Sequence, residues 1–187
     1  MKIRKLFWKT WNFLVHEDSI SSFVADAILI LLIGNFILFP GIGMALNTNF
    51  PVVAVISGSM DHHNIDADDW WLQNAQQYEK YNVSESDFEE FYARNGFDKG
   101  DVLVIQGIPT DELKIGDVIV YSVPQRRDPI IHRIVSLNPV STKGDANHGQ
   151  ISFERAIPEN QIHGKAVALV PYIGWVKVGA MELFGLI

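Results

Sequence analysis

The feature that most constrains this chain is a stretch without any charged side chain, which runs from Ala27 to Met60. Its first half is densely apolar, and the apolar run from Ile20 to Phe39 has about the length, roughly 20 residues, that a helix needs to cross a bilayer. We therefore predict a transmembrane helix and its exit over residues 20–46, ended by the helix-breaking Pro40 and its glycines. The alternatives are a buried core helix and a cleaved secretory signal, although the run exceeds the roughly 7 to 15 apolar residues of such a signal.

Basic and aromatic residues alternate before this run, which indicates its orientation. Residues 1–19 hold Lys2, Arg4, Lys5 and Lys9 among large apolar side chains. Such a mixture is typical of an interfacial segment, and positive charge favours the cytoplasmic side. We expect a single-pass protein of the cell membrane, in contact with membrane lipid, with its N-terminus in the cytoplasm and the remainder of the chain outside.

The net negative charge of the chain is concentrated in residues 61–98, an acidic and aromatic segment. The whole chain has a net charge of -7, which argues against a nucleic-acid partner because phosphate binding requires a positive surface. We predict that this segment is a small helical insertion, with Ser84 as the N-cap of a helix from Glu85 to Arg94. The chain has no cysteine, which excludes disulfides and thiolate metal sites.

Short β-branched runs separated by glycine, proline and aspartate fill most of the rest. They predict a mainly β domain from residues 47–60 and 99–172. The expected strands are 52–56, 102–106, 117–122, 130–137, 151–153 and 164–171. The apolar residues 173–187 are short for a second crossing, so we predict a C-terminal interfacial helix, with a second span as the alternative.

Ser59 ends the first of these strands and is the candidate nucleophile. Gly58 is expected to allow a sharp turn that exposes it. A serine needs a nearby base, and His132, a polar ring in a β-branched run, is the strongest candidate, ahead of Lys143. Asp145 follows a tight turn and could orient the imidazole. Each residue also has an ordinary interpretation: a solvent-facing histidine on an alternating strand, and an aspartate that stabilises a turn.

Five motifs, in order, resemble the conserved boxes of type I signal peptidases. They are Ser57-Gly-Ser-Met60, Gly-Asp-Val at 100–102, Gly-Asp-Val-Ile-Val-Tyr at 116–121, Ile-His-Arg-Ile-Val at 131–135 and Thr-Lys-Gly-Asp-Ala-Asn at 142–147. The fourth motif resembles that of the archaeal and eukaryotic branch of the family, which has a histidine at this position, whereas the bacterial members have a lysine. The resemblance implies that Ser59 is the nucleophile, His132 the base, Asp145 the supporting acid and Ser57 a donor to the oxyanion hole.

The resemblance also implies a membrane-bound serine endopeptidase that removes N-terminal signal peptides from secretory preproteins, cutting after small residues. It implies no cofactor and no metal, and association with the translocation machinery is a further expectation. The alternative is a membrane-anchored binding or scaffold protein that has this fold without turnover.

Two departures from the family pattern affect the site. Asp61-His62-His63 stands where the family usually has proline, and Ile151 stands where many relatives have a second aspartate. The supporting acid is therefore Asp145, Glu154 or neither, in that order of preference. A rival interpretation of the insertion is a divalent metal site, formed by His62, His63, Asp66, Asp68 and Asp69.

Overall fold

The computed structural model describes residues 2–17 and 19–186. Residues 1, 18 and 187, which belong to the predicted N-terminal and C-terminal segments, lie outside the described residues. The chain forms two compact units, of which one ends at Ala45 and the other begins at Leu46.

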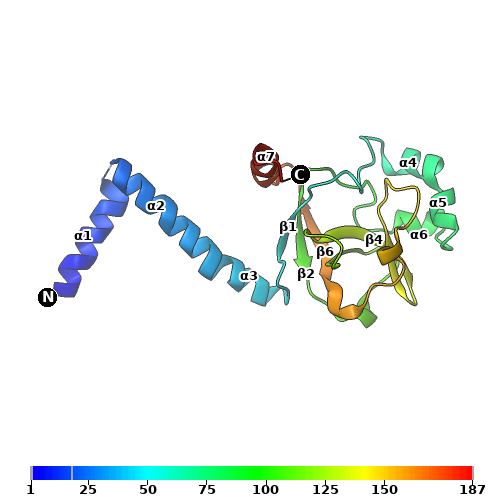
Figure 1. Ribbon diagram of the computed structural model, residues 1–187, viewed down its shortest axis with the longest axis horizontal. Coiled ribbons are helices and arrows are strands. Elements are labelled where there is room, and N and C mark those ends of the chain that lie inside the picture. Colours follow the sequence, from blue (N-terminus) through cyan, green and yellow to red (C-terminus); the bar gives the residue numbers. More distant parts are fainter. Residues whose placement is uncertain (1, 18, 187) are drawn as a thin grey trace. The chain divides into compact units, whose positions relative to one another are not determined.

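The first unit is entirely helical (Figure 1). It contains α1 (Lys2–His16), α2 (Ile20–Ile33), a π-helical segment η1 (Gly34–Leu38) and α3 (Phe39–Ala45). Ser19 caps α2 by accepting a hydrogen bond from the N–H of Ser22. Within the described residues, one continuous helix, the 26 residues Ile20–Ala45, is long and apolar enough to cross a membrane.

The prediction that Pro40 ends this helix is wrong, because the helix continues to Ala45. The π-helical turn of η1 ends at Leu38, two residues before the proline, and shifts the backbone hydrogen-bond pattern there. Proline lacks an N–H group, and local π adjustments let a membrane helix tolerate it. The Asn35 side chain donates to the Leu31 carbonyl at 2.9 Å, so this polar residue is satisfied within the helix.

The second unit is built on one six-stranded sheet, and the prediction of a mainly β fold is confirmed. The strands lie in the order β1-β2-β6-β3-β4-β5, and neighbours are antiparallel. They are β1 (Val52–Ala54), β2 (Val102–Gln106), β3 (Val118–Tyr121), β4 (Ile130–Leu137), β5 (Val140–Lys143) and β6 (Ile162–Val170). Short 3-10 turns connect them: η2 (Thr110–Glu112), η3 (Ser152–Glu154) and η4 (Glu159–Gln161).

One predicted strand is wrong and one strand was not predicted. Residues 152–154 form η3 instead of a strand. The edge strand β5 pairs with β4 and contains Ser141 and Thr142, residues that the sequence pattern assigned to a turn motif. Its polar residues are buried, so tertiary packing overrides the local pattern.

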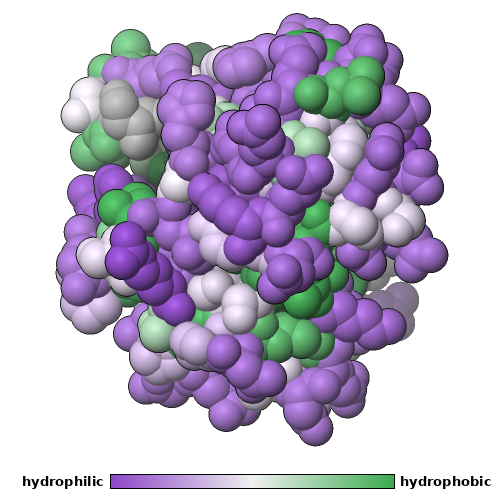
Figure 2. Space-filling view, turned by 90° about the vertical axis from the view of Figure 1, so that its right-hand side faces the viewer, coloured by the Kyte–Doolittle hydropathy of each residue, from purple (hydrophilic) through white to green (hydrophobic). Residues whose placement is uncertain are grey.

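The segment 61–98 folds into three short helices, α4 (Ala67–Asn74), α5 (Gln76–Glu79) and α6 (Glu85–Glu89). Ser84 caps α6 with a capping box, as predicted, but the helix ends five residues before Arg94. The carbonyls of Tyr92 and Ala93 instead accept hydrogen bonds from Arg133. The face of the sheet unit seen in Figure 2, where these helices lie, is mostly hydrophilic.

An aromatic core attaches the three helices to the sheet. It consists of Ala67, Trp70, Trp71, Tyr78, Val83 and Phe88 together with Val135 of β4. Separate clusters fill the rest of the sheet unit, one around Leu103 and Val120 and one around Ile119 and Ile134. The insertion therefore packs onto β4, the strand that carries His132.

The C-terminal helix α7 (Trp175–Leu183) packs through few residues. Val178 is fully buried, and Lys99 forms an ion pair with Glu182 at 2.7 Å. Several large apolar side chains in and around this helix are exposed, namely Tyr172, Ile173, Trp175, Val176, Leu183, Phe184 and Leu186.

Candidate active site

Ser59 lies in the turn that follows β1. The turn is closed by a hydrogen bond from the N–H of Asp61 to the carbonyl of Gly58 at 3.2 Å. A Cβ atom at position 58 would meet only the Asp61 side chain, at 3.8 Å, and the φ angle of Gly58 is not positive. The turn therefore does not need a glycine at this position, contrary to the sequence prediction.

His132 lies on β4, opposite Ile119 of β3, and its ring reaches Ser59. The distance from its Nε2 atom to the Ser59 hydroxyl oxygen is 3.0 Å, which is hydrogen-bond distance. The serine and the histidine, separated by 73 residues in the chain, are thus brought together. Because His132 is 6% exposed, the predicted alternative of a solvent-facing histidine is wrong.

The opposite ring nitrogen of His132, Nδ1, is hydrogen-bonded to the carboxylate of Glu154. Glu154 is fully buried at the end of η3, and its second oxygen accepts a hydrogen bond from the N–H of Ile151 at 2.6 Å. An ionised carboxylate only accepts hydrogen bonds, so it selects the tautomer in which Nδ1 carries the proton. Nε2 is then free to accept the proton of Ser59.

Asp145, the first choice for the supporting acid, is bound elsewhere. Its carboxylate accepts hydrogen bonds from Arg133, His62 and Tyr78. The reason is the alternation of β4, which points neighbouring residues to opposite faces of the sheet. His132 lies on the face of Ile134, whereas Arg133 lies on the face of Val135 and the insertion. The expected pairing of Asp145 with His132 is thus replaced by two separate pairs.

The electrostatics of Asp145 follow from this burial. Burial by itself raises the pKa of the Asp145 carboxyl, but the charge of Arg133 and the hydrogen bonds from His62 and Arg133 lower that pKa well below its usual range. For Tyr78, burial and the nearby Asp145 charge raise the pKa well above its usual value. Asp145 is therefore a carboxylate and Tyr78 a neutral donor at neutral pH.

Lys143, the alternative base, is buried and donates to two carbonyls of its own turn. Its Nζ atom lies 3.0 Å from the Gly144 oxygen and 3.1 Å from the Asp145 oxygen. Burial lowers the pKa of Lys143 to about 8. Its contacts support the 144–146 turn, whereas the contact with the Ser59 hydroxyl is made by His132.

Ser57, predicted to help form an oxyanion hole, is exposed beside the nucleophile. Its hydroxyl oxygen lies 3.4 Å from that of Ser59. The two hydroxyls open into a cleft of about 690 Å³. The cleft is lined by residues from Val53 to Ser59, the turn from Gln125 to Pro129, the start of β4, and Phe97, Asn147, Ile151, Phe153 and Lys177.

Four of the five residues of the rival metal interpretation make other side-chain contacts, including His63, which pairs with Asp61. His62 binds Asp145, Asp66 caps α4 and Asp68 pairs with Arg94. Across residues 2–17 and 19–186, the structure has no group of three histidine, aspartate or glutamate side chains arranged to hold a metal ion.

Comparisons with known proteins find relatives of this chain at modest identity. No protein-family model matches the chain. The chain is 29% identical over 163 residues to the signal peptidase complex catalytic subunit of Schizosaccharomyces pombe, an alignment that covers 81% of this chain and 78% of the relative. It is 27% identical to the corresponding subunit of Tuber melanosporum, with 79% and 72% covered, and 25% identical to that of Zygosaccharomyces rouxii, with 79% and 75% covered.

Three curated relatives with the same description thus align with most of the chain at modest identity. The alignments cover about three quarters of each relative, so the similarity extends well beyond the candidate site. The resemblance that the five motifs predict is confirmed: over most of its length, the chain is similar at modest identity to proteins described as catalytic subunits of signal peptidase complexes.

Proposed function

We propose that this chain is a membrane-anchored serine endopeptidase that removes N-terminal signal peptides from secreted and membrane preproteins. The observation that carries the proposal is the 3.0 Å distance between the Ser59 hydroxyl and Nε2 of His132, at the wall of an open cleft. The names of the relatives support the substrate class, since they are described as catalytic subunits of signal peptidase complexes.

In this proposal, Ser59 attacks the scissile carbonyl while His132 takes its proton at Nε2. Glu154 stabilises the imidazolium that forms, through its hydrogen bond to Nδ1. The imidazolium then protonates the leaving amine, which departs as the new N-terminus of the mature protein. A water molecule, deprotonated by His132, hydrolyses the acyl-enzyme and releases the signal peptide.

The developing oxyanion requires donors beside Ser59. The Ser57 hydroxyl is the proposed side-chain donor, supported by its position 3.4 Å from the nucleophile, and the N–H of Ser59 is the proposed backbone donor. β1 is an edge strand and continues into the cleft wall, so an extended peptide could add alongside it. We propose that small side chains before the cut fill shallow pockets there.

We propose that the helix Ile20–Ala45 anchors the chain in the cell membrane, with the basic N-terminus in the cytoplasm and the sheet unit outside. The length of that helix and the lysine and arginine residues before it support this orientation. The exposed apolar side chains of α7 support a position of this helix at the lipid interface. The relatives' names refer to a complex, which supports association with further subunits and with the translocation machinery.

The test is cleavage of a purified secretory precursor by the full chain in detergent micelles. We expect the wild type to cut, and Ser59→Ala and His132→Ala to lose at least about 10²-fold in rate. His63→Ala is the matched control, because this neighbouring histidine is exposed. Equal cleavage by the alanine variants would exclude Ser59 and His132 as the catalytic pair. Binding of the precursor without cleavage by the wild type would favour the scaffold alternative.

A further inference from the structure

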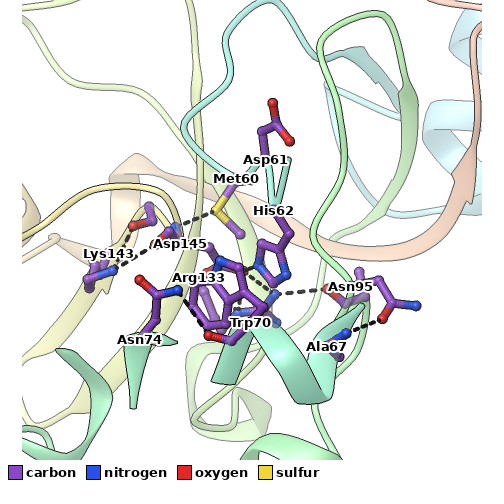
Figure 3. Close-up of polar contacts among 12 residues, drawn as sticks. Met60, Asp61, His62, Ala67, Trp70, Asn74, Asn95, Arg133, Lys143 and Asp145 are labelled. Carbon is purple, nitrogen blue, oxygen red and sulfur yellow. Dashed lines mark hydrogen bonds and ion pairs between the residues drawn. The ribbon is translucent and has the colours of Figure 1, made fainter. Parts of the chain in front are cut away.

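The insertion meets the catalytic domain at a buried polar cluster. We define the Asp145 cluster as Asp145, Arg133, His62 and Tyr78, whose exposed fractions are all 2% or less. Asp145 follows β5 and Arg133 lies on β4, whereas His62 and Tyr78 come from the insertion. Figure 3 shows Arg133 and His62 converging on Asp145, with Trp70 against the histidine ring.

The Asp145 carboxylate is saturated with hydrogen bonds, and the insertion supplies two of them. One oxygen accepts from Arg133 Nη2 at 2.7 Å and from His62 Nε2 at 3.0 Å. The other accepts from Arg133 Nε at 3.0 Å and from the Tyr78 hydroxyl at 2.5 Å. A buried carboxylate offers about four acceptor positions, so each donor removed leaves one unpaired.

The two insertion donors are themselves held in place by packing. The His62 ring stacks on Trp70, with centroids 4.0 Å apart and planes 5° apart. Tyr78 is fully buried among the aromatic residues of the insertion core. Arg133 in turn donates to the carbonyls of Tyr92 and Ala93, so the insertion binds both members of the buried ion pair.

The backbone around Asp145 contacts the nucleophile directly. The N–H of Ala146 donates to the carbonyl of Ser59 at 3.0 Å, and the N–H of Asp145 donates to Sδ of Met60 at 3.3 Å. A Cβ atom at Gly144 would lie 2.8 Å from the Ser59 carbonyl oxygen and 2.8 Å from His132 Nε2. The turn 144–146 therefore touches both members of the candidate catalytic pair.

We propose that His62 and Tyr78 of the insertion are positioning residues for the reaction at Ser59. By binding the Asp145 carboxylate they fix the 144–146 turn, and through the Ala146 N–H they hold Ser59 at hydrogen-bond distance from His132. The insertion thus helps to position the catalytic serine. The expected loss of kcat rests on the proposed function, whereas the expected effect on the 144–146 turn does not.

The test compares two conservative disruptions with matched controls in the full chain, in detergent micelles. Tyr78→Phe removes one hydroxyl and His62→Leu removes one ring donor, whereas His62→Gln keeps a donor at similar reach. The controls are Tyr81→Phe and His63→Leu, which change the same residue types in the same insertion. Thermal unfolding is measured first, so that all variants are compared while folded.

Two readouts are taken from each folded variant. We expect hydrogen exchange at the Ala146 amide to be about tenfold faster in Tyr78→Phe and His62→Leu, as for the loss of one hydrogen bond to a charged group. We expect kcat for precursor cleavage to fall about tenfold with KM within about twofold, because the cleft itself is unchanged. His62→Gln should recover most of both losses, and the controls should match the wild type.

Unchanged exchange at Ala146 in both disrupted variants would overturn the inference. So would faster exchange spread evenly over the sheet, because that pattern indicates only a general loss of stability. An inactive wild type would contradict the proposed function instead, and the exchange rates would still decide whether His62 and Tyr78 fix the turn.

Discussion

Glu154 is hydrogen-bonded to Nδ1 of His132, on the side of the imidazole ring opposite Ser59. His132 is therefore hydrogen-bonded to a serine through one ring nitrogen and to a carboxylate through the other. The carboxylate lies on a 3-10 turn. Asp145, which the sequence favoured for the same role, is part of a different buried pair with Arg133. Two carboxylates thus have two roles, which mutations can separate.

Glu154→Gln is expected to lower kcat by about 10²-fold or more while the protein stays folded. If the oxygen of the new amide still accepts the hydrogen bond from the Ile151 N–H, the NH2 group of that amide faces Nδ1 of His132. The imidazole then carries its proton on Nε2 and cannot accept the Ser59 proton. Precursor cleavage with circular dichroism checks this, and Glu159→Gln, at an exposed position on η4, is the control. A normal kcat would show that Glu154 is not the supporting acid.

Gly144→Ala is expected to impair the active site without unfolding the sheet. The added Cβ would lie 2.8 Å from both His132 Nε2 and the Ser59 carbonyl, closer than real contacts allow. Something must shift, and a displacement of about 1 Å can cost on the order of 10²-fold in rate. Gly149→Ala is the matched control, since a Cβ there meets nothing within 4 Å. Equal cleavage by the two variants would contradict the close approach.

Asp145→Asn is expected to destabilise the protein in a pH-dependent way. At neutral pH the loss of the buried partner of Arg133 should cost about 3–5 kcal/mol. The pKa of Asp145 is lowered in the folded state, so its contribution is complete above the unfolded pKa of about 3.9 and declines as pH falls through that value. Urea unfolding should therefore show the difference between wild type and variant narrowing by about 1 kcal/mol from pH 6 to pH 3. A constant difference would contradict the lowered pKa.

Lys143→Met tests a buried group whose charged form is disfavoured by burial, whereas the charged form of Asp145 is stabilised by its partners. Because burial lowers the pKa of folded Lys143 to about 8, the unfolded chain binds more protons between that pH and about 10.4. The wild type should accordingly gain about 1 kcal/mol of stability relative to Lys143→Met between pH 7 and pH 9. Paired denaturant titrations at the two pH values provide the measurement. If the wild type instead loses stability relative to Lys143→Met over this range, burial does not disfavour the charged form of the Lys143 amine.

The proposed interfacial position of α7 can be tested with a fluorescent label, because the chain has no cysteine. A polarity-sensitive dye on Val176→Cys should be quenched by nitroxide lipids in proteoliposomes. The same dye on Leu72→Cys, a similarly exposed position on α4, should be quenched much less. Equal quenching at both positions would argue against a lipid-facing α7.

The sequence by itself determined the features that depend on local pattern. The apolar run from Ile20 to Phe39, the β-branched runs of the sheet and the N-cap at Ser84 follow from periodicity and residue type. The motifs around Ser59 and His132 also predict the candidate catalytic pair. A sequence pattern cannot, however, give the packing partners of a buried charge.

Only the tertiary structure decided which carboxylate serves which partner. Alternation along β4 places His132 and Arg133 on opposite faces of the sheet. Their pairing with Glu154 and Asp145 depends on how η3 and the 144–146 turn fold back onto that strand. The sequence pattern did not give the contacts of the insertion with Asp145 either, because the two side chains that reach this buried carboxylate, His62 and Tyr78, lie in an acidic segment. Buried polar groups must find partners wherever the fold provides them, and those partners are set by three-dimensional packing rather than by spacing along the chain.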